Sequence, residues 1–479
     1  MNKQQPKRPV ICIIGTTGVG KSQLSIYLAK KLNGEIINAD SMQMYKELPQ
    51  ITNKHPIEER EGIEHHVMNH INWGEEYYIH RFKNECETAM EKIWSLGKVP
   101  IIVGGTHYYL QSVLFNNRTV ENDVSAQTQD EFKDSINSVI KFPQELANLK
   151  TLNSTELHPL LKLCDPVLAA KFHPNDSRRI QRALEIYYTT GRLPSELYKE
   201  QENQRESGSL KHDVLFFWVY SKLNELDIRL DKRVDKMMGN GGWAEVLELG
   251  QYWKQVTKYS PADGIIDKID KNADDKLDSG IFQVIGFKEF LPYLKENPTC
   301  STGSPPINNK LYQLCLEKMK LHTRQYARRQ IKWIKNLLIP QLKEEESNAS
   351  LKFGKVFVLD ATNIDKAEFR DKVENRGLEI ASKFMKNTWV ESINEIPDSL
   401  GDEKGKLIPT DKLKSKVGEW TQQTCEICND RKTGNPLVFV GDQWEIHLKS
   451  KKHRTNIGRG KRKREYEEWL EKQKNHKTD

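Results

Sequence analysis

The chain has 479 residues, of which 37% are hydrophobic and 29% are charged, and its formal net charge is +7. This length allows roughly two to four domains, each with its own core. No run of about 18 apolar residues occurs, which excludes a membrane-spanning helix, and the short polar start Met1–Pro9 leaves no room for a secretory signal.

The first predicted element is a buried strand followed by a phosphate-binding loop. Residues Ile11–Ser22 read ICIIGTTGVGKS, and an amphipathic run follows, which is the P-loop pattern in its strand–loop–helix setting. Glycines let backbone N–H groups turn toward an anion, Lys21 adds a charge, and the Ser22 hydroxyl suits Mg²⁺. A glycine turn without a ligand is the alternative. We predict that these loop residues bind a phosphate or diphosphate: Gly15, Thr16, Gly18, Val19, Gly20, Lys21 and Ser22.

Two further strands are expected to end near this loop. Asp40 follows a strand at Ile36–Asn38, and open α/β sheets bind ligands at the carboxyl ends of their strands. A carboxylate near phosphates is costly unless it holds a metal or accepts a proton, and an ordinary helix N-cap is the alternative. The next strand ends in Gly104-Gly105-Thr106, where kinases and ATPases usually carry an acid that organises Mg²⁺. This departure argues against ATP chemistry.

Helical patterning replaces the strand signals from 118 to 204. One helix there places Arg178, Arg182 and Glu185 on a single face, which is either a binding surface or an ordinary solvated face. The sheet resumes at Val214–Tyr220, and the following helix carries Arg233. An arginine there could reach a diphosphate with its planar fork or pair with a neighbouring aspartate.

The sequence after this helix alternates polar and helical segments. We expect a loop or insert over 259–280, a helix over 318–338, a last strand at Val356–Asp360, and polar linkers over 344–350 and 397–416. The 318–338 helix carries a basic flank, and such a stripe suits a nucleic-acid backbone. Its candidate RNA contacts are Arg324 and Arg328.

The C-terminal region has the ligand spacing of a metal site. Cys425 and Cys428 are separated by two residues, and His447 and His453 by five, which predicts tetrahedral zinc between a hairpin and a helix. Four spare ligands in this order by coincidence are the alternative. A run with nine Lys or Arg and no acid extends from Lys449 to Arg464, and such a run attracts nucleic-acid phosphates. The chain has seven cysteines; the five other than Cys425 and Cys428 are scattered, and so sparse and odd a count indicates a reducing, intracellular protein.

Taken in order, these motifs resemble the eukaryotic tRNA dimethylallyltransferase family over nearly the whole chain. The most specific segments are Gly15–Ser22, Asp40–Tyr45, Val103–Thr106 and Arg324–Trp333, and an appended zinc finger is typical of the eukaryotic branch. The resemblance implies Mg²⁺-assisted transfer of a dimethylallyl group from dimethylallyl diphosphate to N6 of adenosine 37 in the tRNA anticodon loop. The phosphate loop would then hold a prenyl diphosphate rather than ATP.

The resemblance also implies roles for individual residues. Asp40 becomes the general base, and Thr17 and Arg233 contact the diphosphate as it leaves. The resemblance further implies that the target base enters a channel through the core from the side opposite the diphosphate, and the same motifs assign residues to the tRNA side of this channel and to the anticodon-loop contact. These positions are Asp40, Ser41, Met42, Gln43 and Thr106 for the channel, and Asp176, Ser177, Arg178, Arg179, Ile180 and Arg182 for the loop.

We therefore expect an α/β fold with a P-loop parallel-sheet core, a helical insertion domain and a small zinc finger. The expected boundaries are 1–117 and 205–395 for the core, 118–204 for the tRNA-gripping insertion, 396–420 for a linker, and 421–479 for the finger and basic tail. We expect a cytoplasmic monomer, with mitochondrial or nuclear forms left open. The rival functions are a P-loop kinase with an RNA-binding finger and a catalytically silent RNA-binding protein.

Overall fold

The computed structural model describes residues 8–75, 77–116, 144–145, 149, 152, 154–203, 210–257, 277, 279–298, 300, 303–347, 354–363, 365–386, 394–408, 422–429, 434 and 436–458. The chain divides into two compact units, the first formed by Met1–Thr119 and Ser207–Leu413 and the second by Val120–Glu206 and Lys414–Asp479. Most of the loop expected over 259–280, and the basic run from Arg459 onward, lie outside the described residues. No helix within the described ranges is long and apolar enough to span a bilayer.

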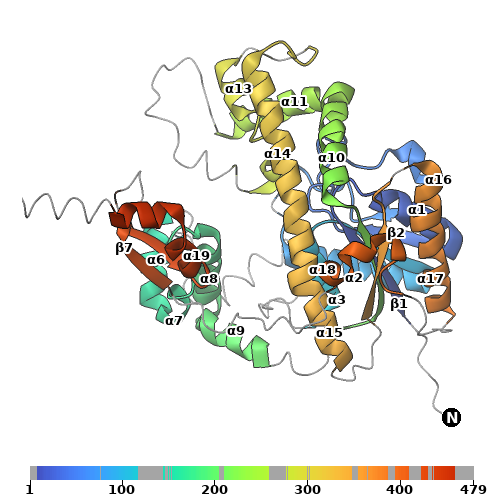
Figure 1. Ribbon diagram of the computed structural model, residues 1–479, viewed down its shortest axis with the longest axis horizontal. Helices are drawn as coiled ribbons and strands as arrows, with labels where there is room; N and C mark the ends of the chain where they lie inside the picture. Colours follow the sequence, from blue (N-terminus) through green and yellow to red (C-terminus); the bar gives the residue numbers. More distant parts are fainter. Residues whose placement is uncertain are drawn as a thin grey trace, which may run out of the picture. The chain divides into compact units, whose positions relative to one another are not determined.

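The first unit is built on a six-stranded sheet in the order β3-β2-β4-β1-β5-β6 (Figure 1), and all its strand pairs are parallel. Parallel sheets are covered by helices on both faces, so their strands read as continuous apolar runs. The α/β fold predicted from the sequence is confirmed. The strands are β1 (Pro9–Gly15), β2 (Gly34–Asn38), β3 (His65–His66), β4 (Val99–Val103), β5 (Asp213–Tyr220) and β6 (Gly354–Asp360).

The register of the central strands decides where the site forms. Val103 of β4 pairs with Ile13 of β1 on one side and with Asn38 of β2 on the other. The three strands therefore end at the same edge of the sheet. The phosphate loop, Asp40 and Gly104 follow these ends directly, so the three motifs meet at the carboxyl edge, where α/β proteins bind ligands.

Helices cover both faces of the sheet. Successive strand residues point to opposite sides, and the apolar residues on both sides pack against helices. Ile11 and Ile13 face the core that includes α1 (Lys21–Leu32) and α17 (Arg376–Met385), which lie close together in Figure 1. Cys12 and Ile14 face the other core. Helices contributing to that second core are α2 (Ile79–Ser95), α3 (His107–Leu114), α11 (Trp243–Thr257), α13 (Leu291–Glu296) and α14 (Lys310–Trp333).

Helix α10 (Leu223–Met237) contributes to both cores, Leu230 to one and Val234 to the other, and thereby carries Arg233 to the edge of the sheet. Shorter helical segments complete the unit. They are η1 (Ile57–Arg60), η3 (Met238–Gly242), η6 (Gly280–Gln283), α16 (Lys366–Phe369) and η8 (Arg370–Asn375).

Two segments expected to be polar linkers contain helix. Helix α14 begins at Lys310, where the Asn309 side chain accepts hydrogen bonds from two backbone N–H groups, and it continues through η7 (Ile334–Leu338) into α15 (Ile339–Ser347). The segment expected as a linker from 344 is thus helical as far as Ser347. Charged residues are good helix formers, so a polar composition did not distinguish linker from exposed helix.

The second such segment is anchored to the core of the first unit. It contains η9 (Asp398–Glu403) and α18 (Lys404–Leu407), with Leu400 and Leu407 buried. The Tyr220 hydroxyl at the end of β5 donates a hydrogen bond to Glu403. Its few apolar residues pack into this core, and the surrounding polar sequence obscured them.

The second unit combines a helical core with a small metal-binding module. Its helices are α6 (Ser154–Cys164), α7 (Pro166–Ala169), α8 (Ser177–Thr190) and α9 (Pro194–Asn203). Leu161, Leu168, Ile180 and Leu184 form the centre of its core. The module consists of the antiparallel strands β7 (Gln422–Asn429) and β8 (Pro436–Val440), followed by α19 (Gln443–Leu448).

Candidate active site and metal centre

The loop between β1 and α1 has a backbone that requires glycine at three positions. Gly15, Gly18 and Gly20 have φ values of 140°, 80° and 90°, which side-chain-bearing residues rarely adopt. A Cβ at Gly15 would lie 2.3 Å from the Val219 carbonyl oxygen. The first turn of α1 has no side-chain cap, so its N–H groups and helix dipole suit an anion.

Lys21 lies against this loop as a partly buried cation. Its ammonium group donates a hydrogen bond of 2.6 Å to the Thr16 carbonyl. Desolvation lowers the pKa of Lys21 to about 8, with Asp40 opposing the shift and Arg233 adding to it. The sequence predicted Lys21 and Asp40 as separate motifs, and the register of β1 and β2 on either side of β4 brings both to the same edge of the sheet.

Thr17 and Arg233 meet directly, although 216 residues separate them. The Arg233 guanidinium donates a hydrogen bond of 2.6 Å to the Thr17 hydroxyl, while its Nε is buried without a partner. Desolvation lowers the pKa of Arg233 to about 10, and Asp40 opposes this. With a pKa of about 10, Arg233 stays charged near neutral pH. The loop therefore faces two cations, Lys21 and Arg233.

Asp40 occupies the turn after β2 and does not begin a helix. Its Oδ1 accepts the Met42 N–H at 3.1 Å, and the Asn38 side chain bonds the backbone of Asp40 on both sides. Desolvation raises the pKa of Asp40, and the Met42 N–H and the two cations oppose the rise. A carboxylate held rigidly with a raised pKa is a competent general base.

The Gly104-Gly105 pair has a steric explanation. A Cβ on Gly104 would lie 2.3 Å from the backbone of Ala39, and a Cβ on Gly105 would lie 2.2 Å from Nε2 of Gln330. Thr106 then bonds back to β2, because its N–H donates to the Ala39 carbonyl at 3.1 Å. The turn after β2 and the end of β4 are therefore packed too closely for an acidic side chain.

The residues predicted to face RNA in this unit have different environments. The Thr106 hydroxyl accepts the Ser41 N–H at 3.0 Å. The Gln43 side chain donates to the carbonyls of Thr52 and Asn53, and Met42 packs against the core.

Arg324 and Arg328 of α14 pair with aspartates of α10. Arg324 pairs with Asp231, and Arg328 pairs with Asp227 at 2.5 Å. These two pairs join the helices, and Arg328 stays nearly half exposed.

Gln330 is a site residue that the sequence reasoning missed. It is 3% exposed, its Oε1 accepts the Thr17 N–H at 3.0 Å, and its Nε2 donates to the Gly105 carbonyl at 3.1 Å. Tyr326, one turn earlier, lies near Asp40, and burial raises the pKa of its hydroxyl. Both belong to the Arg324–Trp333 motif, and their spacing of four residues was the available signal.

The start of α8 carries the residues predicted to contact the anticodon loop. Asp176 caps the helix by accepting the Arg179 N–H, and the Arg179 guanidinium bonds back to Asp176 at 2.5 Å. Arg182 pairs with Glu185 at 3.3 Å. Ile180 is fully buried in the core, so its side chain packs within the unit, and its predicted contact with tRNA stays a prediction. Ser177 and Arg178 stand in the first turn between these residues.

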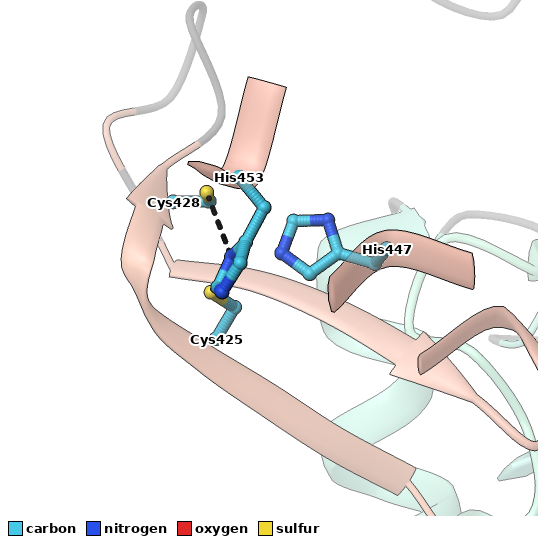
Figure 2. Close-up of side chains that lie close together, drawn as sticks. All are labelled: Cys425, Cys428, His447 and His453. Carbon is cyan, nitrogen blue, oxygen red and sulfur yellow. Dashed lines mark hydrogen bonds between the residues drawn. The ribbon is translucent and has the colours of Figure 1, made fainter. Parts of the chain in front are cut away.

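Cys425, Cys428, His447 and His453 converge in the second unit, as Figure 2 shows. All four are buried, with ligand atoms within 4.8 Å of one another. The two sulfurs lie 3.5 and 3.6 Å from Nδ1 of His453. Bond lengths of about 2.3 Å to sulfur and 2.0 Å to nitrogen place a sulfur and a nitrogen ligand of tetrahedral zinc about 3.5 Å apart, so these two separations fit a shared zinc ion.

Two further observations support a metal at this position. Nε2 of His447 is buried without a hydrogen-bond partner, which is costly unless a ligand occupies it. The Asn456 side chain donates to the Cys428 sulfur at 3.2 Å. Within the described part of the chain, no other group of three or more His, Cys, Asp or Glu side chains has this geometry.

Comparison with known proteins gives one consistent family. Residues 43–337 match the model of the IPP transferase family. The chain is 43% identical to the tRNA dimethylallyltransferase of Saccharomyces cerevisiae, covering 96% of this chain and 95% of that protein. It is 30% identical to the human tRNA dimethylallyltransferase, covering 95% and 87%.

A solved structure extends the similarity to three dimensions. It is described as a eukaryotic dimethylallyltransferase acting on tRNA, and it is 41% identical with a TM-score of 0.74. The match covers 97% of this chain and 100% of that one.

Proposed function

The chain belongs to the tRNA dimethylallyltransferase (IPP transferase) family, and from this premise we propose how its residues transfer a dimethylallyl group to N6 of adenosine 37 in tRNA. The observation that carries the proposal is the meeting of Thr17, Arg233, Lys21 and Asp40 at one edge of the sheet. Two cations and a glycine loop suit a diphosphate, and a carboxylate beside them suits proton transfer.

The proposed reaction is a substitution at the first carbon of the prenyl donor. The N6 lone pair forms the C–N bond while the C–O bond to the diphosphate breaks, and the bonding electrons remain on the diphosphate oxygen. The N6 proton goes to Asp40. An exocyclic amine is a weak nucleophile because its lone pair is delocalised, so removing its proton as the bond forms contributes about 10²–10⁴-fold.

The leaving diphosphate gains charge, and the loop side of the site offers groups to stabilise it. Lys21 and Arg233 supply fixed positive charges, and Thr17 is held in place by Arg233. Groups aimed at charge that develops in the transition state lower the barrier more than groups that bind the ground state. Arg233 is therefore expected to serve the chemical step as well as binding.

The Ser22 hydroxyl, in the first turn of α1, is our candidate protein ligand for Mg²⁺. In P-loop proteins the Ser or Thr hydroxyl after the loop lysine holds Mg²⁺ together with the substrate phosphates, so the Ser22 hydroxyl fits this role. When bound, the ion would neutralise part of the diphosphate charge.

The adenine must leave its stack to reach Asp40, which costs a few kcal/mol and less in a single-stranded loop. We propose that the turn after β2, with Ser41 hydrogen-bonded to Thr106, lines the route of the base. We also propose that the insertion domain at 118–204 grips the anticodon stem-loop through α8, and that the buried Cys₂His₂ set holds a structural zinc ion.

The deciding experiment incubates the protein with labelled dimethylallyl diphosphate, Mg²⁺ and tRNA that lacks the modification. We expect label on adenosine 37 with release of diphosphate. A parallel incubation with ATP tests the kinase alternative. Steady ATP turnover without labelled RNA would overturn the proposal, and RNA binding without either reaction would favour the silent RNA-binding protein.

A further inference from the structure

Within the second unit, the zinc module contacts the turn that leads into α8. Two hydrogen bonds join them. The His173 ring Nε2 lies 3.0 Å from the Val438 carbonyl of β8, and the Gln422 side chain of β7 donates to the Phe172 carbonyl at 3.3 Å. These contacts span 265 and 250 residues of sequence, so both strands of the hairpin hold the same short turn.

The hydrogen bonds of His173 show which of its two ring nitrogens carries the proton. Its Nδ1 accepts the Asn175 N–H at 3.1 Å, so in the neutral ring the proton is on Nε2 and is donated to Val438. The His173 carbonyl also accepts the Asp176 N–H at 2.8 Å. One residue thus links the hairpin to the N-cap of α8.

Phe172 provides a second connection to the same helix. The Arg179 guanidinium lies over its ring at 5.2 Å, a distance suited to a cation–π contact. Arg179 also pairs with Asp176. The two polar residues at the start of α8 are therefore supported from the turn that the hairpin holds.

The hairpin in turn depends on the metal ligands. Cys425 and Cys428 belong to β7, and the Phe439 ring of β8 stacks on His447 at 4.0 Å. Val438 precedes Phe439 in the chain. The carbonyl that His173 contacts therefore lies next to the residue whose ring packs on the metal-ligand residue His447. Small metal modules of this kind fold only when the metal is bound.

We infer that the metal-bound hairpin positions the start of α8, so that metal occupancy sets the arrangement of Asp176 and Arg179. The finger then supports RNA binding through the insertion domain and not only through its own cations. His173 is the positioning residue at this junction. The RNA part of this inference rests on the proposed function, whereas the structural coupling does not.

The test measures amide hydrogen exchange at Arg179 and Ile180 and tRNA affinity at fixed salt, both in the full chain. Removing the metal with a chelator should speed exchange at both amides and weaken tRNA binding. His173→Ala and Gln422→Ala should each do the same with zinc content unchanged. We expect the variants to weaken tRNA binding roughly three- to tenfold, the range of one net hydrogen bond.

Two variants serve as controls. His158 makes a comparable bond to the Ala169 carbonyl, at 3.1 Å within the helical core, so His158→Ala should leave tRNA affinity within about twofold. His173→Gln keeps a donor able to reach Val438 and should restore both readouts. Chelation or His173→Ala that leaves the two amides unchanged would overturn the inference, even if tRNA affinity falls. If wild-type protein binds no tRNA, the proposed function fails, and the exchange data still decide the coupling.

Discussion

The backbone N–H of Thr17 donates to the side-chain oxygen of Gln330 at 3.0 Å, across 313 residues of sequence. A phosphate-loop amide is thereby held by the protein itself. The other end of the same side chain bonds Gly105, so Gln330 joins the loop after β1 to the strand end that precedes Thr106. A buried amide with both groups satisfied is a rigid connector.

Replacing Gln330 should therefore weaken binding of the prenyl donor. We expect Gln330→Leu to raise the KM for dimethylallyl diphosphate roughly three- to tenfold, because the Thr17 N–H loses its acceptor. Gln330→Glu should raise it further, since it places a negative charge beside the diphosphate. Steady-state kinetics and a separate tRNA binding measurement check this. Gln341, another buried glutamine, is the matched control as Gln341→Leu. A loss of tRNA affinity with an unchanged KM would contradict the assignment.

Asp40→Asn should abolish proton acceptance while keeping the turn intact. Asparagine retains an oxygen for the Met42 N–H, so tRNA binding should stay near that of the wild type. The single-turnover rate should fall about 10²–10⁴-fold. Asp360→Asn, at the buried carboxyl end of the edge strand β6 in the same sheet, controls for the loss of an aspartate at a strand end. Near-normal turnover by Asp40→Asn would assign the base elsewhere.

The charge of Lys21 predicts a pH dependence for donor binding. Its pKa is lowered to about 8, so the ammonium group is charged below that pH and loses its proton above it. Affinity of the tRNA-free protein for dimethylallyl diphosphate should fall as the pH rises through about 8. Calorimetric titration from about pH 7 to about pH 9, roughly one pH unit on either side of this pKa, measures it. A flat profile across this interval would show that Lys21 does not bind the diphosphate as a cation.

Asn456 should tune the metal site through its bond to the Cys428 sulfur, 3.2 Å away. Hydrogen bonds to metal ligands commonly change metal affinity about 10- to 100-fold. We expect Asn456→Leu to lower zinc affinity by at least about tenfold, measured by competition with a chromophoric chelator. Thr455→Val, at the adjacent exposed position, should bind zinc as the wild type does. Equal affinities for the two variants would exclude a role for this hydrogen bond.

Local patterns were enough to predict the elements that carry their own sequence signals. The P-loop glycines, the apolar parallel strands and the Cys₂His₂ spacing each reflect chemistry within a short segment, and the parallel-sheet core and the clustering of the four ligands are confirmed. The partners of Gln330 and His173 were not predictable in this way. Their contacts lie hundreds of residues away, and nothing in the neighbouring sequence distinguishes such a side chain from an ordinary polar one.

Helix α8 also shows what sequence motifs cannot predict, here among residues close together in the chain. Ile180 and Leu184 lie together in the core of the second unit, whereas the family motif assigns Ile180 to the tRNA contact, because a motif does not separate a contacting side chain from a supporting one. Arg324 and Arg328 illustrate the converse, since a basic stripe on one helix met acidic partners on another. Opposite charges on separate helices cannot be paired from sequence alone.

The close approach of Gly104 to the Ala39 backbone, where a Cβ would come within 2.3 Å, limits what this scaffold can be engineered to do. Nucleotide hydrolases place an acid near this strand end to organise Mg²⁺ and water. Installing one here by Gly104→Asp would push β2 away from β4 and displace Asp40 with it. Redesign toward ATP hydrolysis would therefore have to rebuild the sheet edge first.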